Sequence, residues 1–356
     1  MEKIRFVFVL PPGMFFSKSK AGSIELCTHD LATSHHFKML STVIGPTVID
    51  PLSDNFIGIA SDSEKSFKNQ LTDLIKHINP EMVIINQQFR IASRLKKKFM
   101  SIKVLVYRHN HVKKRSGLSK IWMNIYLKPI DHFLFCSDYI RDEFSKIFPS
   151  YKHKCSTLYN AVNVDIWNPK IKRENVILFI GRPTDDKGLI EFLQAGEQIL
   201  NEFAGWTVKI IISHAHLDRE YENYAKKIID NHDKMMLCEN VEYSEIIREC
   251  ETAGIMVVPS KWAEPFGRTA IEALSGGAAL ISSGKGGLAE ASEDAALYLN
   301  SISKEEIYCK IKQLIENPEL AENIRQKGYE LIKKKFSQKI VYANLAKFFQ
   351  LHLNKN

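Results

Sequence analysis

Apolar residues in the first half of this chain gather in short continuous runs, separated by longer segments with helical spacing. We expect strands at residues 4–10, 47–50, 82–86, 103–107 and 132–136. Apolar runs of this length, without alternating polar positions, are typical of parallel strands covered on both faces. Ser63–Ile78 is one of the amphipathic segments between them. The pattern therefore predicts a parallel sheet with helices on both of its faces.

The second half repeats this alternation after a segment rich in Asn, Asp and Pro at residues 158–169. We expect strands at residues 175–180, 208–213, 235–237, 255–258 and 278–281, with helices between them and further helices at 304–316, 318–335 and 338–353. The polar segment marks a hinge. We therefore predict a first domain at 1–170, a second at 171–337, and a final helix at 338–356 that packs back on the first domain.

Length and composition fit two globular domains, but the charge is unevenly distributed. The chain has 356 residues, 45% hydrophobic and 25% charged, with a net charge of +8. Residues 1–170 hold 25 Lys and Arg against 14 Asp and Glu, a net of +11, whereas residues 171–356 hold 24 against 27, a net of −3. The basic character therefore belongs to the first half.

Two basic clusters carry much of this charge. The first comprises Arg90, Arg94, Lys96, Lys97, Lys98 and Lys103, and the second comprises Arg108, Lys113, Lys114, Arg115 and Lys120. Such clusters are often solvated faces, but apolar residues including Trp122 lie among them, as in surfaces that rest on anionic lipid headgroups. A nucleic-acid-binding module is a further alternative, which the lack of a recognisable binding motif disfavours.

Neither the N-terminus nor the cysteines indicate export. The seven-residue apolar run before Pro11 and Pro12 is too short for a membrane span and lacks a small-residue cleavage site. The six cysteines are widely spaced, without a CxxC pair or metal-ligand spacing to histidine. We therefore expect a cytoplasmic protein with reduced thiols, with peripheral contact to the inner face of a membrane as the extension that the basic half suggests.

The strongest candidate for chemistry is the stretch at residues 253–290. It places Glu264 in the loop after one buried strand and Glu272 on the helix that follows. Loops after the carboxyl ends of parallel strands bind ligands, and N–H groups at a helix start attract phosphate oxygens. One carboxylate is therefore expected to bind sugar hydroxyls and the other a ribose. The plainer alternative is a surface helix with two solvated glutamates.

A second candidate is the segment GRPTDDKG, which follows the first strand of the second half. Gly181 ends the strand, while Arg182 and Lys187 place two cations at the start of the next helix. Such an arrangement suits a diphosphate. The alternative is that both cations pair with Asp185 and Asp186.

Other loops at the predicted ligand edges add candidates. Gly22, next to a helix that we expect Ser23 to cap, lets a ligand approach the backbone. Gly286 and Gly287 offer backbone donors in the segment GKGGLAE. His109 directly follows a predicted strand, with His111 as the alternative histidine.

The segments GRPTDDKG, PSKWAEPFGRTAIEAL, SGGAALISS and GKGGLAE, in this order, resemble the retaining glycosyltransferases of family 4. That family has the GT-B fold, in which two Rossmann-like doubly wound domains face a central cleft. The resemblance covers about residues 155–295. The first half is similar only loosely, with one glycine where many members have two, and with His109-Asn110 where the family often has His-Asp.

The resemblance implies transfer of a hexose from a UDP-, GDP- or ADP-sugar, with retained configuration, to a glycan or lipid-linked acceptor, as in lipopolysaccharide synthesis. It implies catalytic roles for His109, Arg182, Lys187 and Glu264. The expected donor-binding residues are Gly22, Gly181, Arg182, Lys187, Glu264, Phe266, Gly267, Arg268, Glu272, Gly286 and Gly287. No Asp-x-Asp metal motif is present, so we expect neither metal nor cofactor. A sugar-nucleotide epimerase of the same fold is the alternative enzyme.

Overall fold

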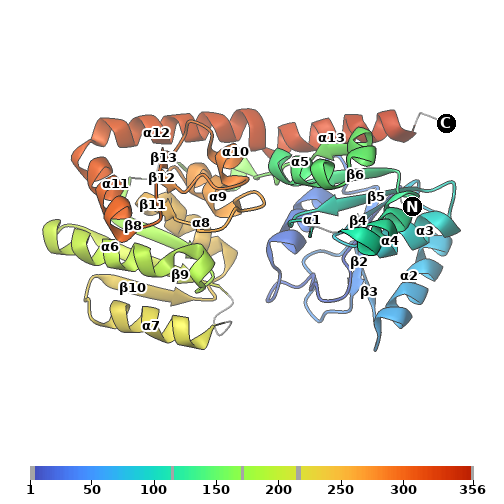
Figure 1. The fold of residues 1–356 in the computed structure, drawn as a ribbon, viewed down its shortest axis with the longest axis horizontal. Coiled ribbons are helices and arrows are strands. Elements are labelled where there is room, and N and C mark those ends of the chain that lie inside the picture. The colour runs from blue at the N-terminus through green and yellow to red at the C-terminus, as the bar shows by residue number, and fades with distance from the viewer. Residues whose placement is uncertain (1–4, 114–115, 170–171, 214–217, 354–356) are drawn as a thin grey trace. The chain divides into compact units, whose positions relative to one another are not determined.

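The computed structural model describes residues 5–113, 116–169, 172–213 and 218–353. The chain divides into two compact units: an N-terminal unit of Met1–Ala161 with Gln338–Asn356, and a C-terminal unit of Val162–Ser337 (Figure 1). Each unit is built on a parallel sheet, as the sequence pattern predicted.

The sheet of the N-terminal unit has seven parallel strands in the described part of the chain, in the order β3-β2-β1-β4-β5-β6-β7. The strands are β1 (Phe6–Val9), β2 (Ser41–Pro46), β3 (Phe56–Ile59), β4 (Met82–Asn86), β5 (Lys103–Arg108), β6 (His132–Phe135) and β7 (Cys155–Thr157). The helices are α1 (Ser23–Thr33), α2 (Glu64–Ile78), α3 (Phe89–Lys98), α4 (Gly117–Leu127), α5 (Asp138–Ile147), the 3-10 turn η1 (Pro149–Lys154) and the final helix α13 (Gln338–Leu353).

The strand expected at residues 47–50 is wrong. Those residues lie in a loop after β2, and the Ile49 side chain in it is fully exposed. The strand lies just before, at Ser41–Pro46, and a second one follows at Phe56–Ile59. The residues of β2 are buried although Ser41 and Thr42 are polar, because their hydroxyl groups donate to the carbonyl oxygens of Ala32 and Asn55.

The end of the chain completes the N-terminal unit. Helix α13, drawn in red, lies beside α5 and β6 in Figure 1. The ring of Phe349 stacks on Phe6 of β1 at 5.3 Å and meets the edge of Phe37 at 5.6 Å, while Phe348 packs on His132 of β6 at 4.8 Å. These aromatic contacts bury one face of α13 against the first sheet.

The C-terminal unit holds six parallel strands in the described residues, in the order β10-β9-β8-β11-β12-β13. They are β8 (Glu174–Gly181), β9 (Thr207–Ile212), β10 (Met235–Glu239), β11 (Ala253–Val258), β12 (Ala279–Ser282) and β13 (Leu297–Tyr298). The helices are η2 (Val164–Ile166), η3 (Asp185–Lys187), α6 (Leu189–Glu202), α7 (Arg219–Asp230), α8 (Tyr243–Thr252), α9 (Arg268–Gly276), α10 (Leu288–Ser292), α11 (Lys304–Glu316), α12 (Pro318–Leu331) and the π-helical turn η4 (Ile332–Phe336).

The first unit ends at Ala161, before the expected boundary at residue 170. Val162 already belongs to the second unit, because its N–H group donates to the carbonyl oxygen of Phe336 at 2.8 Å and it forms a parallel bridge with Ser337. The two points where the chain passes between units are thus hydrogen-bonded neighbours. No helix in the described ranges combines the length and the apolar character that a bilayer span requires.

Candidate active site

The order of strands in each sheet reverses at one point, and such a point is where open parallel sheets bind ligands. In the C-terminal unit the reversal falls between β8 and β11, which are neighbours in the sheet. Arg182 and Lys187 follow the carboxyl end of β8, and Glu264 follows that of β11. Three of the predicted residues therefore belong to the two loops that flank this point.

Lys187 and Glu264 form an ion pair that joins these two loops. The Lys187 Nζ atom lies 2.5 Å from Oε1 of Glu264, and the Ser260 hydroxyl donates to the same oxygen at 2.7 Å. The two side chains are only 17% and 12% exposed. The ammonium group also lies 5.3 Å from the ring centre of Trp262. Partial burial strengthens such a pair and fixes both groups in position.

Arg182 is placed differently from Lys187. Its guanidinium group contacts the Asp186 carboxylate at 3.3 Å and is 40% exposed. Asp185 instead pairs with Lys261 at 2.5 Å. The alternative in which both cations pair with the two aspartates therefore holds for Arg182 but is wrong for Lys187.

Glu272 lies on α9 and pairs with Arg268 from the preceding turn. The Arg268 Nε atom donates to Oε1 of Glu272 at 2.8 Å, and the two side chains are 14% and 7% exposed. The guanidinium group also lies 5.2 Å from the ring centre of Tyr243. Glu272 is therefore a buried, paired carboxylate rather than a solvated surface residue.

Glycines bring the loop of Glu264 close to the loop after β12. Gly286 has φ +67°, and a side chain there would place its Cβ 2.5 Å from the carbonyl oxygen of Glu264. The Gly287 N–H group donates to that same oxygen at 2.7 Å. Gly267, with φ +109°, starts α9 directly against Leu288. The Gly287 donor, which we expected to face a ligand, thus holds the two loops together.

The N-terminal unit places His109 at the carboxyl end of β5. The imidazole is buried, and its Nε2 atom lies 3.2 Å from the Asn86 side-chain oxygen. Burial, reinforced by the charge of Arg108, lowers the pKa of His109 to about 3. The ring is therefore neutral near pH 7. His111 instead lies 3.0 Å from the Glu143 carboxylate on α5.

Gly22 lies at the start of α1, but the expected cap is wrong. Ser23 is the first residue of the helix, and Gly22 occupies the cap position without a side-chain hydrogen bond. The first turn is fixed instead by Glu25, which accepts from the N–H group of Phe15 at 3.1 Å. A Cβ at this position would lie 3.1 Å from the Glu25 carboxylate, so a side chain here would require that carboxylate to shift by a few tenths of an ångström.

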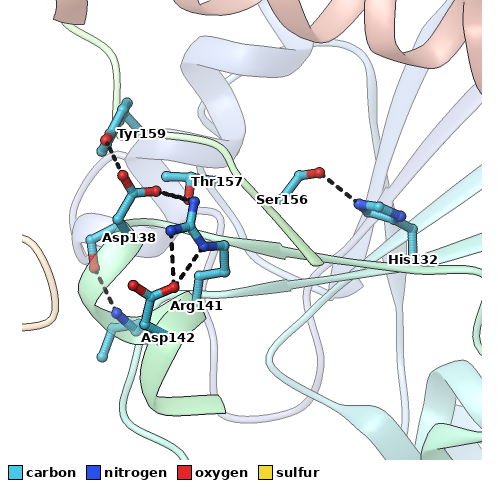
Figure 2. Close-up of polar contacts among 9 residues, drawn as sticks. His132, Asp138, Arg141, Asp142, Ser156, Thr157 and Tyr159 are labelled. Carbon is cyan, nitrogen blue, oxygen red and sulfur yellow. Dashed lines mark hydrogen bonds and ion pairs between the residues drawn. The ribbon is translucent and has the colours of Figure 1, made fainter. Parts of the chain in front are cut away.

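The segment that follows β7 is held by a polar network at the start of α5 (Figure 2). Ser137 caps this helix and accepts from the N–H group of Ile140 at 3.1 Å. Asp138 accepts from Tyr159 at 3.1 Å and from Thr157, and pairs with Arg141 at 2.5 Å. These bonds fix the residues just before Asn160, whose side chain accepts from the Tyr107 hydroxyl at 3.3 Å.

Gln87 could not be identified from the sequence pattern. It follows β4, beside the point between β1 and β4 where the strand order of the first sheet reverses. It is a buried residue in the left-handed region, with φ +64°. Neither polar atom of its side chain has a hydrogen-bond partner among the described residues. Non-glycine residues in this conformation with unpaired buried groups concentrate at functional sites.

Within the described residues, no group of three or more His, Cys, Asp or Glu side chains is arranged to hold a metal ion. The charges of the site are instead those of its own lysine, arginine and glutamate side chains.

A comparison with protein families identifies the half of the chain that holds Lys187 and Glu264. Residues 164–331 match the family described as glycosyl transferases group 1. The chain is 24% identical over 281 residues to spore coat protein SA of Bacillus subtilis, covering 72% of this chain and 74% of that protein. It is 25% identical over 185 residues to lipopolysaccharide 1,2-N-acetylglucosaminetransferase of Salmonella typhimurium, covering 49% of this chain and 47% of that enzyme.

Solved structures share the whole fold. The crystal structure of a glycosyltransferase from Rickettsia africae matches with a TM-score of 0.82 at 18% identity, covering 100% of both chains. Anabaena HepE, solved in complex with UDP and glucose, matches with a TM-score of 0.79 at 14% identity, covering 98% of this chain and 99% of that one. Both are GT-B structures, so the two parallel-sheet units form this fold.

Proposed function

Because the chain is a glycosyltransferase with a group 1 domain in its second half, we propose that it transfers a hexose from a nucleoside diphosphate sugar to an acceptor hydroxyl. The observation that carries the proposal is the ion pair between Lys187 and Glu264 at the reversal of the second sheet. It places a cation and a carboxylate together where parallel sheets bind nucleotides. UDP-glucose is the first donor to test, because the similar HepE structure was also solved with that ligand.

The donor diphosphate is held by Lys187 and Arg182. An ammonium group has three donors, so Lys187 can keep its bond to Glu264 while it donates to a phosphate oxygen. Arg182 is partly exposed and bound to Asp186 at 3.3 Å, so its remaining donors are open to a second phosphate oxygen. Glu264 accepts from sugar hydroxyls with its other oxygen, and Glu272 accepts from the ribose.

Transfer proceeds with retention of configuration at the anomeric carbon. The bond from that carbon to the phosphate oxygen breaks, and the nucleoside diphosphate leaves with the electron pair. The acceptor oxygen forms its bond on the same face, and its proton passes to the departing phosphate. Lys187 and Arg182 stabilise the charge that develops on the leaving group. In this proposal no metal is needed, because the Lys187 and Arg182 cations would neutralise the leaving diphosphate.

His109 contributes as a neutral group. With its pKa lowered to about 3, the imidazole cannot act as a cation near pH 7. A neutral ring can still donate or accept a hydrogen bond with a hydroxyl of the donor sugar. The role assigned to His109 is therefore to position the sugar rather than to supply charge.

The acceptor is a cell-surface glycan or its lipid-linked precursor. Support comes from the names of the relatives, which include a spore coat protein and a lipopolysaccharide transferase. The two relatives are only 24% and 25% identical to this chain, and the family match at residues 164–331 leaves out the N-terminal unit, where the acceptor binds in this proposal. A panel of acceptors is therefore required.

The test is a thermal-shift panel of UDP-, GDP- and ADP-sugars, followed by a transfer assay with the donor that stabilises the protein most. A ligand at 100 times its Kd stabilises the folded state by about 2.7 kcal/mol. We expect one nucleotide to stand out and its sugar to appear on an added acceptor. Stabilisation by none of them, or conversion of the donor to another sugar nucleotide without acceptor, would overturn the proposal.

A further inference from the structure

Helix α3 presents four basic side chains around a shallow hollow whose described lining holds no candidate active-site residue. The hollow measures about 370 Å³ and is lined by Arg90, Arg94, Lys97 and Lys98, together with Ser93 and Tyr126. Tyr126 belongs to the neighbouring helix α4, and its ring lies 5.4 Å from the Arg90 guanidinium carbon. Figure 1 shows α3 and α4 side by side. The lining contains cations but no carboxylate.

Acidic side chains of the described residues do not pair directly with these cations, although the Glu64 carboxylate on α2 interacts electrostatically with Arg90. Across the described ranges, none of the four forms an ion pair with an Asp or Glu side chain. Arg94 donates to the neutral Asn69 side chain at 2.8 Å, and Lys98 lies 5.9 Å from the Phe99 ring. A hollow lined by four cations and no described carboxylate is suited to a multiply anionic partner.

The neighbouring helix α4 adds an exposed apolar strip. Leu118, Ile121, Trp122 and Ile125 are 75%, 58%, 61% and 44% exposed. Their spacing of three and four residues places them along one face of the helix. Tyr126 follows Trp122 by four residues, so the hollow continues this strip. Contiguous exposed apolar surface of this kind marks an interaction site.

We propose that α3 and α4 form a docking surface for a bilayer rich in anionic phospholipid. The hollow on α3 receives lipid phosphate groups, and the strip on α4 enters the boundary between headgroups and acyl chains. A membrane surface offers negative charge and apolar depth side by side, which is the combination these two helices present. Nucleic acid would neutralise the cations but leave the apolar strip exposed to water. Lys120 of the second basic cluster lies on α4 as well, whereas Lys114 and Arg115 lie outside the described residues.

Sedimentation of the full chain with vesicles tests this surface without any need for activity. We expect binding to phosphatidylcholine vesicles that contain 30% phosphatidylglycerol, little binding to phosphatidylcholine alone, and weaker binding as salt is raised. Lys97→Glu with Lys98→Glu should weaken partitioning by at least about 20-fold, because each basic residue near an anionic surface contributes roughly fivefold. Trp122→Ser should weaken it by about tenfold at every salt concentration.

Matched variants in the C-terminal unit provide the controls. Lys333→Glu with Lys334→Glu changes the net charge equally at another adjacent exposed pair, and Tyr224→Ser removes an aromatic ring that is 51% exposed on α7. Both should bind vesicles like the wild type. All variants should keep the thermal shift given by the preferred nucleotide sugar, so a failure here is distinct from a failure of the proposed function.

Three results would overturn the proposal. One is equal sedimentation with neutral and anionic vesicles, and another is an equal loss in the control variants. The third is a protein that does not sediment with vesicles but uses the α3 and α4 residues to bind single-stranded RNA or to form a dimer.

Discussion

The Nζ atom of Lys187 lies 2.5 Å from Oε1 of Glu264, although 77 residues separate them in the sequence. The contact joins the loop after β8 to the loop after β11, at the point where the order of strands reverses. Neither residue could be placed against the other from local pattern alone. Their meeting is what makes this sheet edge a nucleotide-binding candidate rather than an ordinary connection.

Removal of the Lys187 charge should abolish most transfer. We predict that Lys187→Ala lowers kcat/KM by about a hundredfold or more, because a cation that stabilises a leaving phosphate acts chiefly in the transition state. Steady-state kinetics with the preferred donor provide the measurement.

The matched control for Lys187 is Lys209→Ala. Lys209 on β9 pairs with Glu249 on α8 at 2.7 Å, and both side chains are similarly buried. Neither residue belongs to the loops that hold Lys187 and Glu264. The Lys209→Ala variant should be less stable than the wild type but keep the wild-type kcat/KM. Equal kinetic losses in the two variants would assign Lys187 a structural role only.

Glu272 should be specific for the ribose. We predict that Glu272→Gln raises the KM for the donor by about tenfold to a hundredfold, since hydrogen bonds to charged groups contribute roughly 1.5–3 kcal/mol. A donor with deoxyribose in place of ribose separates this effect from the loss of the Arg268 pair. The variant and the wild type should bind that donor alike; a penalty that persists with deoxyribose would show that Glu272 only holds Arg268.

Gly286 should tolerate no side chain. We predict that Gly286→Ala lowers the free energy of unfolding by about 2 kcal/mol and impairs donor binding, because it combines a positive φ with a clash against the Glu264 carbonyl. Urea denaturation measures the first effect and thermal shift the second. Gly205→Ala is the control, since its Cβ would lie 3.8 Å from the nearest atom, and it should change stability by less than about 0.5 kcal/mol.

The buried His109 should make the protein less stable in mild acid. Its pKa is about 3 when folded and 6.5 in the unfolded chain, so the unfolded state binds the extra proton as the pH falls. The stability is fully present above pH 6.5 and declines toward pH 3, by about 2 kcal/mol at pH 5. His109→Gln should remove this part of the slope between pH 7 and pH 5 in urea denaturation. An identical pH dependence in the variant would mean that His109 is not held neutral by the fold.

The C-terminal unit could be predicted closely from the sequence because its signals are local. Ile255–Val258 is a short apolar run, and it forms the core of β11 at Ala253–Val258. Gly276 and Gly277, a glycine pair of the kind that closes helices, end α9, the latter with φ +81°. Buried parallel strands and helix ends closed by glycine each have a sequence pattern only a few residues long, so their positions can be predicted from that pattern.

The N-terminal unit was harder to predict because the sequence features that determine its elements are less local. β2 begins with Ser41 and Thr42, whose hydroxyl groups donate to backbone carbonyl oxygens and can therefore be buried. These two residues interrupt the apolar pattern, so the strand was not predicted at its true position. Gln87 is a polar residue with a left-handed backbone conformation and a side-chain amide that has no hydrogen-bond partner among the described residues. Both features depend on the surrounding fold. The hydrogen bond from Gly287 to Glu264 likewise joins two loops whose contact cannot be predicted from either segment of the sequence.

The most direct measurement is a crystal structure of the full chain with the nucleoside diphosphate sugar that stabilises it most. The account predicts phosphate oxygens within hydrogen-bond distance of Lys187 Nζ and the Arg182 guanidinium group, a sugar hydroxyl at Glu264 and the ribose at Glu272. A nucleotide bound elsewhere, with the Lys187–Glu264 pair untouched and no phosphate beside it, would contradict the central claim.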